Sequence, residues 1–301
     1  MSATPEEPAA EDRTAVPEMP AAMVGDVVAG DLVEVAPGVR RLTAPNPGMM
    51  TGPGTNCYLV GTEELTVVDP GPDDLAHLDA LVAAGEGRIR WIALTHTHVD
   101  HWPATPSLAR RTGAEVAAFD ARDGLERVDL ALTDEVEVGV GDGRLVAVHT
   151  PGHASNHVCL WDEARGLLFT GDHVMSGSTV VIAPPDGDMA AYISSLEKVR
   201  DLGATALAPA HGPVLTDPAP YLDDYLSHRL DRERQVVEAL AAAGPAGADT
   251  EALVEAIYVD VHELLHPVAR FSVWAHLRKL AAEGRARSLD VDDPDTTWVG
   301  I

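Results

Sequence analysis

The distribution of apolar residues along the chain predicts a mixed α/β protein. Short apolar or alternating runs, which are typical of strands, lie at residues 32–35, 39–43, 55–60, 65–68, 91–94, 115–119, 134–140, 144–148, 167–169 and 206–208. Longer stretches with helical spacing lie between several of these runs, at residues 74–84, 104–112 and 189–202. This alternation of strands and helices predicts one α/β domain that closes near residue 218.

After residue 218 the pattern becomes helical. A long amphipathic stretch runs from Tyr221 to Leu240, a short helix is expected to end at Tyr258, and a third helix covers about residues 268–283. Residues 285–289 can then return as a strand, so residues 219–301 are predicted to form a small winged-helix domain. Residues 1–28 are rich in Ala, Pro and Glu and are predicted to be a disordered tail, which leaves 29–218 for the α/β domain.

Composition narrows the classes of function. The 301 residues carry a formal net charge of −27, which repels polyanions at long range and argues against a general nucleic-acid binder. No apolar run approaches the roughly 20 residues of a membrane span, so no membrane partner is expected. The N-terminus lacks the basic and apolar regions of a signal peptide. Cys57 and Cys159 lie in apolar runs, as buried free thiols do. We therefore expect a cytoplasmic protein.

A cluster of metal-binding side chains follows the predicted strand at residues 91–94. His96, His98, Asp100 and His101 lie within six residues, and imidazole and carboxylate groups are common zinc ligands. Strand alternation predicts that His96 and His98 point to the same side, so that both can reach one ion. Asp100 and His101 lie just past the strand, where a loop or helix start can direct them to a second ion.

Three more metal-competent side chains follow other predicted strands. His153 comes after the run at 144–148, Asp172 after 167–169 and His211 after 206–208. Side chains at the ends of several strands can meet at one rigid sheet edge. Five imidazoles and two carboxylates exceed the four ligands of a single tetrahedral zinc, so the set predicts two ions that share a carboxylate.

Residues 96–101 resemble the signature His-x-His-x-Asp-His of the metallo-β-lactamase superfamily, and the three later side chains match its remaining ligands in order. The resemblance implies two Zn²⁺ per chain. By that resemblance the first zinc takes His96, His98 and His153, the second takes Asp100, His101 and His211, and Asp172 bridges both. The expected fold class is α/β: an αββα metallo-β-lactamase sandwich with a small C-terminal winged-helix domain.

The region after the α/β domain is similar to one branch of that superfamily. The similarity lies in Ser227-His228-Arg229-Leu230, Leu265-His266, residues 276–280 and Glu283-Gly284-Arg285. This branch is the β-lactamase-like protein 2 family, whose animal members are mitochondrial single-strand endoribonucleases. Its fungal relatives are thioesterases that act on carrier-bound polyketide acids. The resemblance implies a hydrolase and leaves its substrate open.

Position along the chain suggests roles for four residues. Asp100, besides binding metal, is the candidate proton carrier to the leaving group. Asp69 begins an Asp-Pro-Gly turn and is interpreted as a turn former rather than a metal ligand. His157 and His173 lie beside ligand positions, where they can orient a ligand, contact substrate or bond to the backbone.

Three functions remain open from the sequence. The first is a dinuclear zinc hydrolase that uses a metal-bridging hydroxide on a small ester, thioester or lactone. The alternative is a single-strand-specific endoribonuclease with the same zinc site, because five basic residues and one acidic residue lie between Arg270 and Arg287. A non-enzymatic winged-helix regulator is disfavoured by the complete ligand set. A small-molecule substrate is the expected partner, and single-stranded RNA is the other possibility.

Overall fold

The computed structural model describes residues 21–301. The predicted tail, residues 1–28, lies mostly outside that range. In its described part, helix α1 (Ala21–Val24) is followed by a turn, and the side chains of Met23 and Val27 are buried. No helix within residues 21–301 has the length and apolar character needed to span a membrane.

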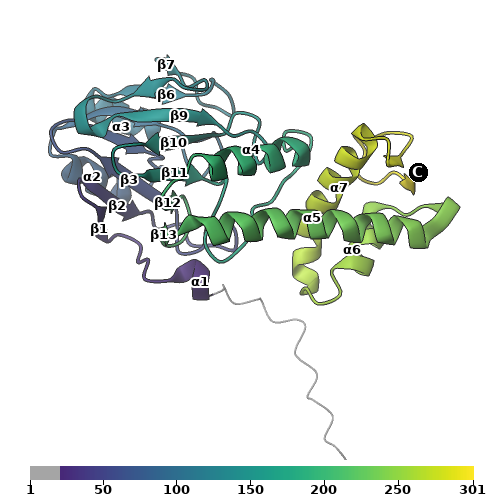
Figure 1. Ribbon diagram of the computed structural model, residues 1–301. Coiled ribbons are helices and arrows are strands. Elements are labelled where there is room, and N and C mark those ends of the chain that lie inside the picture. The colour runs from purple at the N-terminus through teal and green to yellow at the C-terminus, as the bar shows by residue number, and fades with distance from the viewer. Residues whose placement is uncertain (1–20) are drawn as a thin grey trace, which may run out of the picture.

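Two β-sheets form the centre of the larger, N-terminal part of the molecule (Figure 1). The first has the order β1 (Leu32–Ala36), β2 (Val39–Thr43), β3 (Asn56–Val60), β4 (Leu65–Val68), β5 (Ile89–Ala93), β6 (Glu115–Ala118) and β7 (Leu130–Ala131). The second has the order β13 (Leu215–Thr216), β12 (Ala206–Pro209), β11 (Leu167–Gly171), β10 (Val158–Asp162), β9 (Leu145–His149) and β8 (Glu137–Val138). Neighbours from β4 to β7 are parallel, as are β11 and β12, and all other neighbouring pairs in these two sheets are antiparallel.

Helices cover the outer face of each sheet. Helices α2 (Leu75–Gly85) and α3 (Thr105–Thr112) pack on the first sheet, and α4 (Met189–Asp201) and the first half of α5 (Pro218–Ala243) pack on the second. A 3₁₀ turn, η1 (Gly141–Gly143), connects β8 to β9. Carboxylates set the starts of two helices, since Asp74 caps α2 and Asp188 caps α4 through backbone N–H groups of the first turn.

Alternation along the strands decides which layer each side chain enters. On β3, Cys57 and Leu59 pack with α2 and α3, whereas Tyr58 and Val60 face the second sheet. Tyr58 meets Phe169 of β11 edge to face, with 5.1 Å between ring centroids. Because both faces of each sheet are covered, the central strands form continuous apolar runs. The order helix, sheet, sheet, helix confirms the predicted αββα sandwich.

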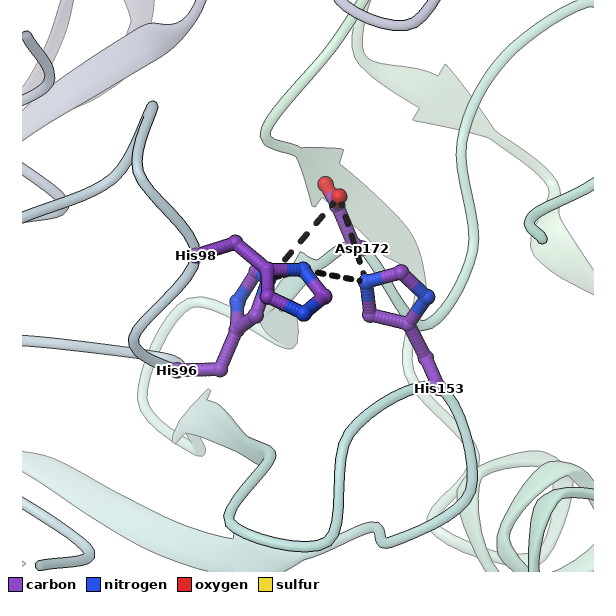
Figure 2. A group of neighbouring side chains, drawn as sticks. All are labelled: His96, His98, His153 and Asp172. Atoms are coloured by element: carbon purple, nitrogen blue, oxygen red, sulfur yellow. Dashed lines mark hydrogen bonds and ion pairs between the residues drawn. The ribbon is translucent and has the colours of Figure 1, made fainter. Parts of the chain in front are cut away.

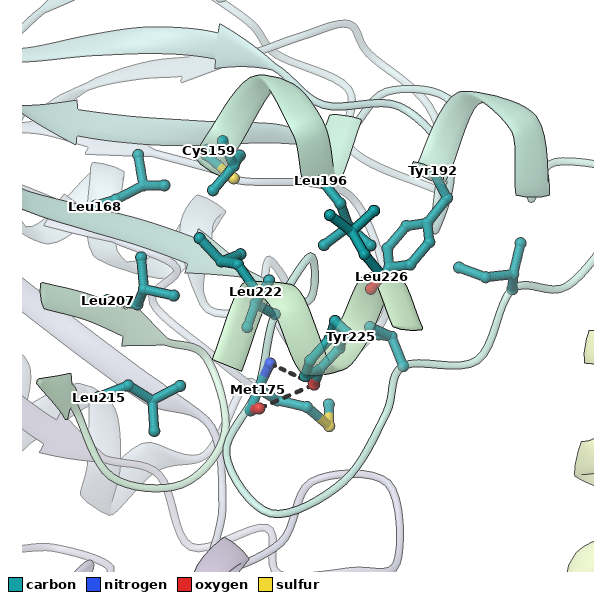
Figure 3. Packing of buried hydrophobic residues seen from close by; sticks show 14 of the residues in the cluster. Cys159, Leu168, Met175, Tyr192, Leu196, Leu207, Leu215, Leu222, Tyr225 and Leu226 are labelled. Atoms are coloured by element: carbon teal, nitrogen blue, oxygen red, sulfur yellow. Dashed lines mark hydrogen bonds between the residues drawn. The ribbon is translucent and has the colours of Figure 1, made fainter. Parts of the chain in front are cut away.

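The C-terminal part consists of helices and a short hairpin. It contains η2 (Gly244–Ala246), α6 (Thr250–Ile257), η3 (Glu263–Leu265), α7 (His266–Ala282), β14 (Ala286–Arg287) and β15 (Val299–Gly300). Helix α5 joins the two parts (Figure 1): Leu222 and Leu226 lie in the core between α4 and the second sheet (Figure 3), whereas Val236 and Leu240 lie in the C-terminal core. A division of the chain at residue 218 therefore stays a prediction, because α5 packs on both sides of it.

Candidate metal centre

The seven predicted ligands converge at one edge of the sandwich, where strands of both sheets end. Residues 96–101 follow β5, and the loop between β9 and β10 carries His153. Asp172 comes directly after β11, and His211 follows two residues after β12. The ligand atoms form two groups, in each of which they lie within 4.8 Å of one another. The structure thus brings together all seven residues that the sequence singled out.

One detail of the sequence analysis is wrong. Strand β5 ends at Ala93, so His96 and His98 lie in a loop, and strand alternation does not set their direction. The loop is held instead by a side chain and by the other sheet. Thr95 N–H donates to Asp69 Oδ1 (2.8 Å), and Val158 N–H of β10 donates to Thr95 O (2.8 Å). The two histidines meet because these bonds fix the loop.

The first group consists of His96, His98, His153 and Asp172 (Figure 2). His98 Nδ1 lies 3.0 Å from His96 Nε2 and 3.0 Å from His153 Nε2. Asp172 Oδ2 lies 3.9 Å from His96 Nε2 and 3.6 Å from His153 Nε2. Three nitrogen atoms and one carboxylate oxygen therefore surround one point.

Hydrogen bonds made by Nδ1 of His96 and His153 indicate that the hydrogen of each ring is on Nδ1 and the lone pair on Nε2. His153 Nδ1 donates to Val181 O (2.8 Å), and His96 Nδ1 donates to Thr95 Oγ1 (3.1 Å), whose own hydrogen bonds a carboxylate. Burial lowers the pKa of His96 well below its ordinary value and that of His153 to about 4, so both rings are neutral at pH 7. Each Nε2 then carries a lone pair. Because His98 Nδ1 can donate to only one of them, a cation placed between the rings would satisfy the lone pair that remains.

The second group consists of Asp100, His101 and His211. Asp100 Oδ2 lies 3.5 Å from His101 Nε2 and 3.2 Å from His211 Nε2. Asp172 Oδ1 lies 3.5 Å and 3.2 Å from the same two nitrogen atoms. The two oxygens of Asp172 thus face different groups, Oδ2 the first and Oδ1 the second.

The donor sets fit two metal ions. His101 Nε2, His211 Nε2 and Asp172 Oδ1 are buried and face one another at 3.2–3.5 Å without hydrogen-bond geometry, an arrangement that an ion between them would complete. In a tetrahedral zinc site with bonds of about 2.0–2.1 Å, neighbouring ligand atoms lie about 3.3 Å apart, close to the observed separations. The seven side chains are therefore able to hold zinc.

Charge differs between the two groups. Burial lowers the pKa of His211, but the carboxylates of Asp172 and Asp100 outweigh it and raise that pKa to about 9. Burial is likewise outweighed at His101, where Asp100, Asp172 and Asp69 raise the pKa well above its ordinary value. Burial would raise the pKa of Asp172, but His211 and His101 hold it well below its usual range. The second group therefore attracts positive charge, which protons or a metal ion can supply.

Asp69 has a contact that the sequence analysis missed. His101 Nδ1 donates to Asp69 Oδ2 (3.0 Å), which orients the ring with Nε2 toward the second group. The same carboxylate accepts from the N–H and the hydroxyl of Thr95. Asp69 also has the left-handed backbone (φ 48°) of a turn residue, as expected. The sequence signal that could have indicated this second role is the position of the carboxylate at the end of β4, the strand beside β5.

The backbone before Asp172 is fixed by its neighbours. Gly171 has φ 50°, and a Cβ there would lie 2.5 Å from Thr95 Oγ1 and 2.7 Å from His157 Nε2. His157 Nε2 accepts the N–H of Asp172 (3.2 Å), and its Nδ1 donates to Thr150 Oγ1 (2.9 Å). His157 is wholly buried and orients a ligand through its backbone, which is one of the roles expected for it.

Other reactive side chains near the sandwich core are buried. The ring of His173 lies 5.1 Å from that of Tyr192, and burial lowers its pKa to about 3. Cys57 and Cys159 are the buried free thiols that were predicted. Burial raises the pKa of Cys159 to about 12 and that of Cys57 well above its ordinary value, so neither is poised as a nucleophile.

Most of the basic segment in the C-terminal part is engaged in ion pairs. The pairs are Arg270–Asp295, Arg278–Asp292, Lys279–Glu233 and Arg285–Glu233. Glu233 lies on α5 and contacts both Lys279 Nζ and Arg285 Nη1 at 2.7 Å. These four cations are largely neutralised within the chain, so they present little net positive charge to a phosphate backbone.

Family models match both parts of the chain. The model described as Metallo-beta-lactamase superfamily matches residues 50–211, a range that contains all seven candidate ligands. The chain belongs to the metallo-β-lactamase superfamily. The model described as Beta-lactamase associated winged helix domain matches residues 250–298, which confirms the predicted winged helix. Members of this superfamily are generally hydrolytic enzymes and typically bind zinc.

Individual relatives confirm the predicted branch. The chain is 31% identical over 275 residues to a Beta-lactamase-like protein 2 homolog from Drosophila melanogaster, across 83% of this chain and 92% of the relative. It is 33% identical over 242 residues to an atrochrysone carboxyl ACP thioesterase from Aspergillus chevalieri, across 77% of each chain. The crystal structure of a Beta-lactamase domain protein from Burkholderia ambifaria has the same fold, with a TM-score of 0.73, 22% identity, and coverage of 92% of this chain and 96% of that one.

Proposed function

We propose that this chain is a dinuclear zinc hydrolase of a small carboxylic ester, thioester or lactone. The observation that carries the proposal is the bridging position of Asp172, whose two oxygens face two separate groups of ligands. In this proposal the first ion is bound by His96, His98 and His153, and the second by Asp100, His101 and His211. Asp172 is shared between them.

The residues of the chain have distinct roles in this reaction. When bound, a pair of zinc ions supplies a water molecule of lowered pKa and a Lewis acid for the substrate oxygen. The Nδ1 bonds of His101 and His153 hold both rings with Nε2 toward the site. Asp100 has the more exposed carboxylate, with 22% of its side chain accessible against 11% for Asp172. Its Oδ1, which is not the oxygen facing His211, is the proposed proton carrier to the leaving group.

A small acyl substrate is favoured over RNA by charge, whereas the relatives include members of both kinds. The net charge of −27 repels a polyanion, and four cations of the winged helix are paired with carboxylates of the chain. The name of the Aspergillus chevalieri relative describes a thioesterase acting on a carboxyl group bound to ACP. We therefore propose a thioester as the first substrate to test.

Two measurements on the zinc-reconstituted protein test this function. Elemental analysis should give about two zinc ions per chain, and Asp172→Ala should lose most of both, since one carboxylate serves two ions. An acyl thioester and a single-stranded RNA should be assayed side by side with both proteins. We expect thioester hydrolysis that disappears in Asp172→Ala, and no RNA cleavage above the level of that variant.

The outcomes separate the alternatives. A zinc content near zero after reconstitution would reject the metal site. RNA cleavage that depends on Asp172, without thioester hydrolysis, would assign the endoribonuclease function to the same site. Hydrolysis of both substrates would leave the metal chemistry in place and reject the restriction to small molecules.

A further inference from the structure

The segment that follows Asp172 forms a wall beside the metal centre and has no regular structure. This wall segment, residues 174–182, contains no helix or strand, yet Val174, Met175, Val180 and Ile182 are buried. It also contacts the first ligand group directly, because Val181 O accepts the Nδ1–H of His153 (2.8 Å). That bond keeps the hydrogen on Nδ1 and leaves the lone pair of Nε2 for a metal.

Two side chains of α5 hold the wall segment. The hydroxyl of Tyr225 accepts from Met175 N–H (3.0 Å) and lies 2.9 Å from Met175 O and 2.5 Å from Ser178 O, one of which accepts its hydrogen. Figure 3 shows Tyr225 reaching Met175 from the helix. Arg229, one helical turn later, donates from Nη2 to Val180 O (2.5 Å). The carbonyl bound by Arg229 thus belongs to the residue before Val181.

Arg229 also contacts the other side of the His153 loop. Its guanidinium lies 5.1 Å from the centre of the Tyr192 ring on α4. Tyr192 packs against the residue before His153, since a Cβ on Gly152 would lie 2.3 Å from Tyr192 Cα. The same arginine therefore touches the two structures that flank His153, the wall segment and helix α4.

The burial of Arg229 is difficult to explain by packing alone. The residue is 2% exposed and forms no ion pair with a carboxylate among residues 21–301. A buried guanidinium without a counter-ion is costly, and an apolar side chain of similar size would fill the same space at lower cost. Its bond to Val180 O and its contact with Tyr192 give it a directional role that an apolar side chain lacks.

We propose that Tyr225 and Arg229 are positioning residues for the metal ligand His153 and act through the wall segment. The inference rests on the proposed function, in which His153 binds zinc. Tyr225 and Arg229 lie on the half of α5 that packs on the second sheet, and the same helix continues into the C-terminal core, so the helix that joins the two parts also supports the metal centre. Loss of either contact should loosen Val181 O and with it the orientation of the imidazole.

The test compares Tyr225→Phe and Arg229→Met with the unaltered full-length protein. Stepwise zinc affinity is measured by chelator competition, and the ligand field is followed in the visible spectrum of the cobalt-substituted protein. We expect each variant to bind the first ion about tenfold more weakly, as is typical when a bond supporting a metal ligand is lost. The cobalt spectrum should change in both, and Arg229→Lys, which keeps a donor, should restore part of the affinity.

A matched control separates positioning from stability. Thr250 is buried, and its hydroxyl donates to Pro294 O within the C-terminal part (2.8 Å). Thr250→Val therefore removes a buried hydroxyl hydrogen bond as Tyr225→Phe does, but the partners of this hydroxyl, Pro294 and Arg270, belong to the C-terminal part and not to the wall segment. It should lower the stability of the metal-free protein while leaving zinc affinity and the cobalt spectrum unchanged.

The results distinguish the two proposals. Absence of zinc from the unaltered protein would reject the proposed function, and the positioning role with it. Two zinc ions in the unaltered protein, with unchanged affinity and spectrum in Tyr225→Phe and Arg229→Met, would overturn the positioning role alone. An equal loss of affinity in Thr250→Val would also overturn it, because the effect would then follow general stability.

Discussion

Replacing Asp69 by Asn should weaken zinc binding at the second group while leaving the packing of the protein core unchanged. The carboxylate accepts three hydrogen bonds: from Thr95 N–H (2.8 Å), the Thr95 hydroxyl (2.7 Å) and His101 Nδ1 (3.0 Å). An asparagine amide has the same shape but only one accepting oxygen. If that oxygen keeps the Thr95 N–H, the amide nitrogen faces the hydrogen on His101 Nδ1. The imidazole can avoid this contact by moving its hydrogen to Nε2, the atom that should bind the second ion.

The magnitude follows from losing a bond that orients a metal ligand. Such losses typically weaken metal binding 10–100-fold, or about 1.4–2.7 kcal/mol at one site. Asp69→Ala should be worse, because it leaves three buried donors without an acceptor, at about 1–3 kcal/mol each. Zinc titration with a competing chelator should resolve the two affinities. The second should fall more in Asp69→Asn than the first, whose ligand His96 is linked to Asp69 Oδ2 only through the Thr95 hydroxyl.

A surface carboxylate provides the control for charge. Asp74→Asn removes one negative charge and keeps an oxygen to cap α2 at His77 N–H, so it should bind both ions as the unaltered protein does. Nitrogen-15 NMR of the zinc-loaded protein should report which nitrogen of His101 carries the hydrogen, because the raised pKa of His101 keeps both nitrogens protonated in the metal-free protein at neutral pH. The reasoning would be refuted by an Asp69→Asn protein that binds the second zinc with undiminished affinity.

Three further predictions concern packing, charge and pH. Gly152→Ala should lower the free energy of unfolding by about 2–6 kcal/mol, because the φ of 141° strains the backbone and the added Cβ would lie 2.3 Å from Tyr192 Cα. Gly87→Ala, with φ 74° and open space around the added Cβ, should cost less in the same denaturant titration. The nearby His276 ring (3.9 Å) and hydrogen bonds from Lys279 and Arg285 hold the pKa of Glu233 at about 2, a depressed value, so its contribution to stability is present above pH 4.5 and lost toward pH 2. The difference between Glu233→Gln and the unaltered metal-free protein should shrink over that interval. The pKa of His211 is raised to about 9 and that of His101 well above its ordinary value, so zinc must displace a proton from each ring. Affinity at the second group should therefore rise by at least about tenfold from pH 7 to 8, whereas a flat profile in calorimetry would contradict this.

Much of the centre could be predicted because its ligands follow strands whose apolar runs are continuous in sequence. Residues 96–101 concentrate four ligands after β5, and the ends of β9, β11 and β12 supply the other three. The sandwich follows for the same reason, since period-two alternation on β3 sends Cys57 to one core and Tyr58 to the other. Local pattern was misleading where the backbone leaves the strand early, at Ala93, and side chains take over its hydrogen bonds.

The sequence by itself determined the residue types, the elements that carry them and the edge at which they meet, because these depend on periodicity over a few residues. Only the tertiary structure decided which oxygen of Asp172 faces which group, that Asp69 orients His101, and that Arg229 reaches the wall segment. It also decided that Glu233 neutralises Lys279, 46 positions away. Hydrogen bonds and ion pairs act over about 3 Å of space. Separation along the chain does not predict that distance until the core has packed.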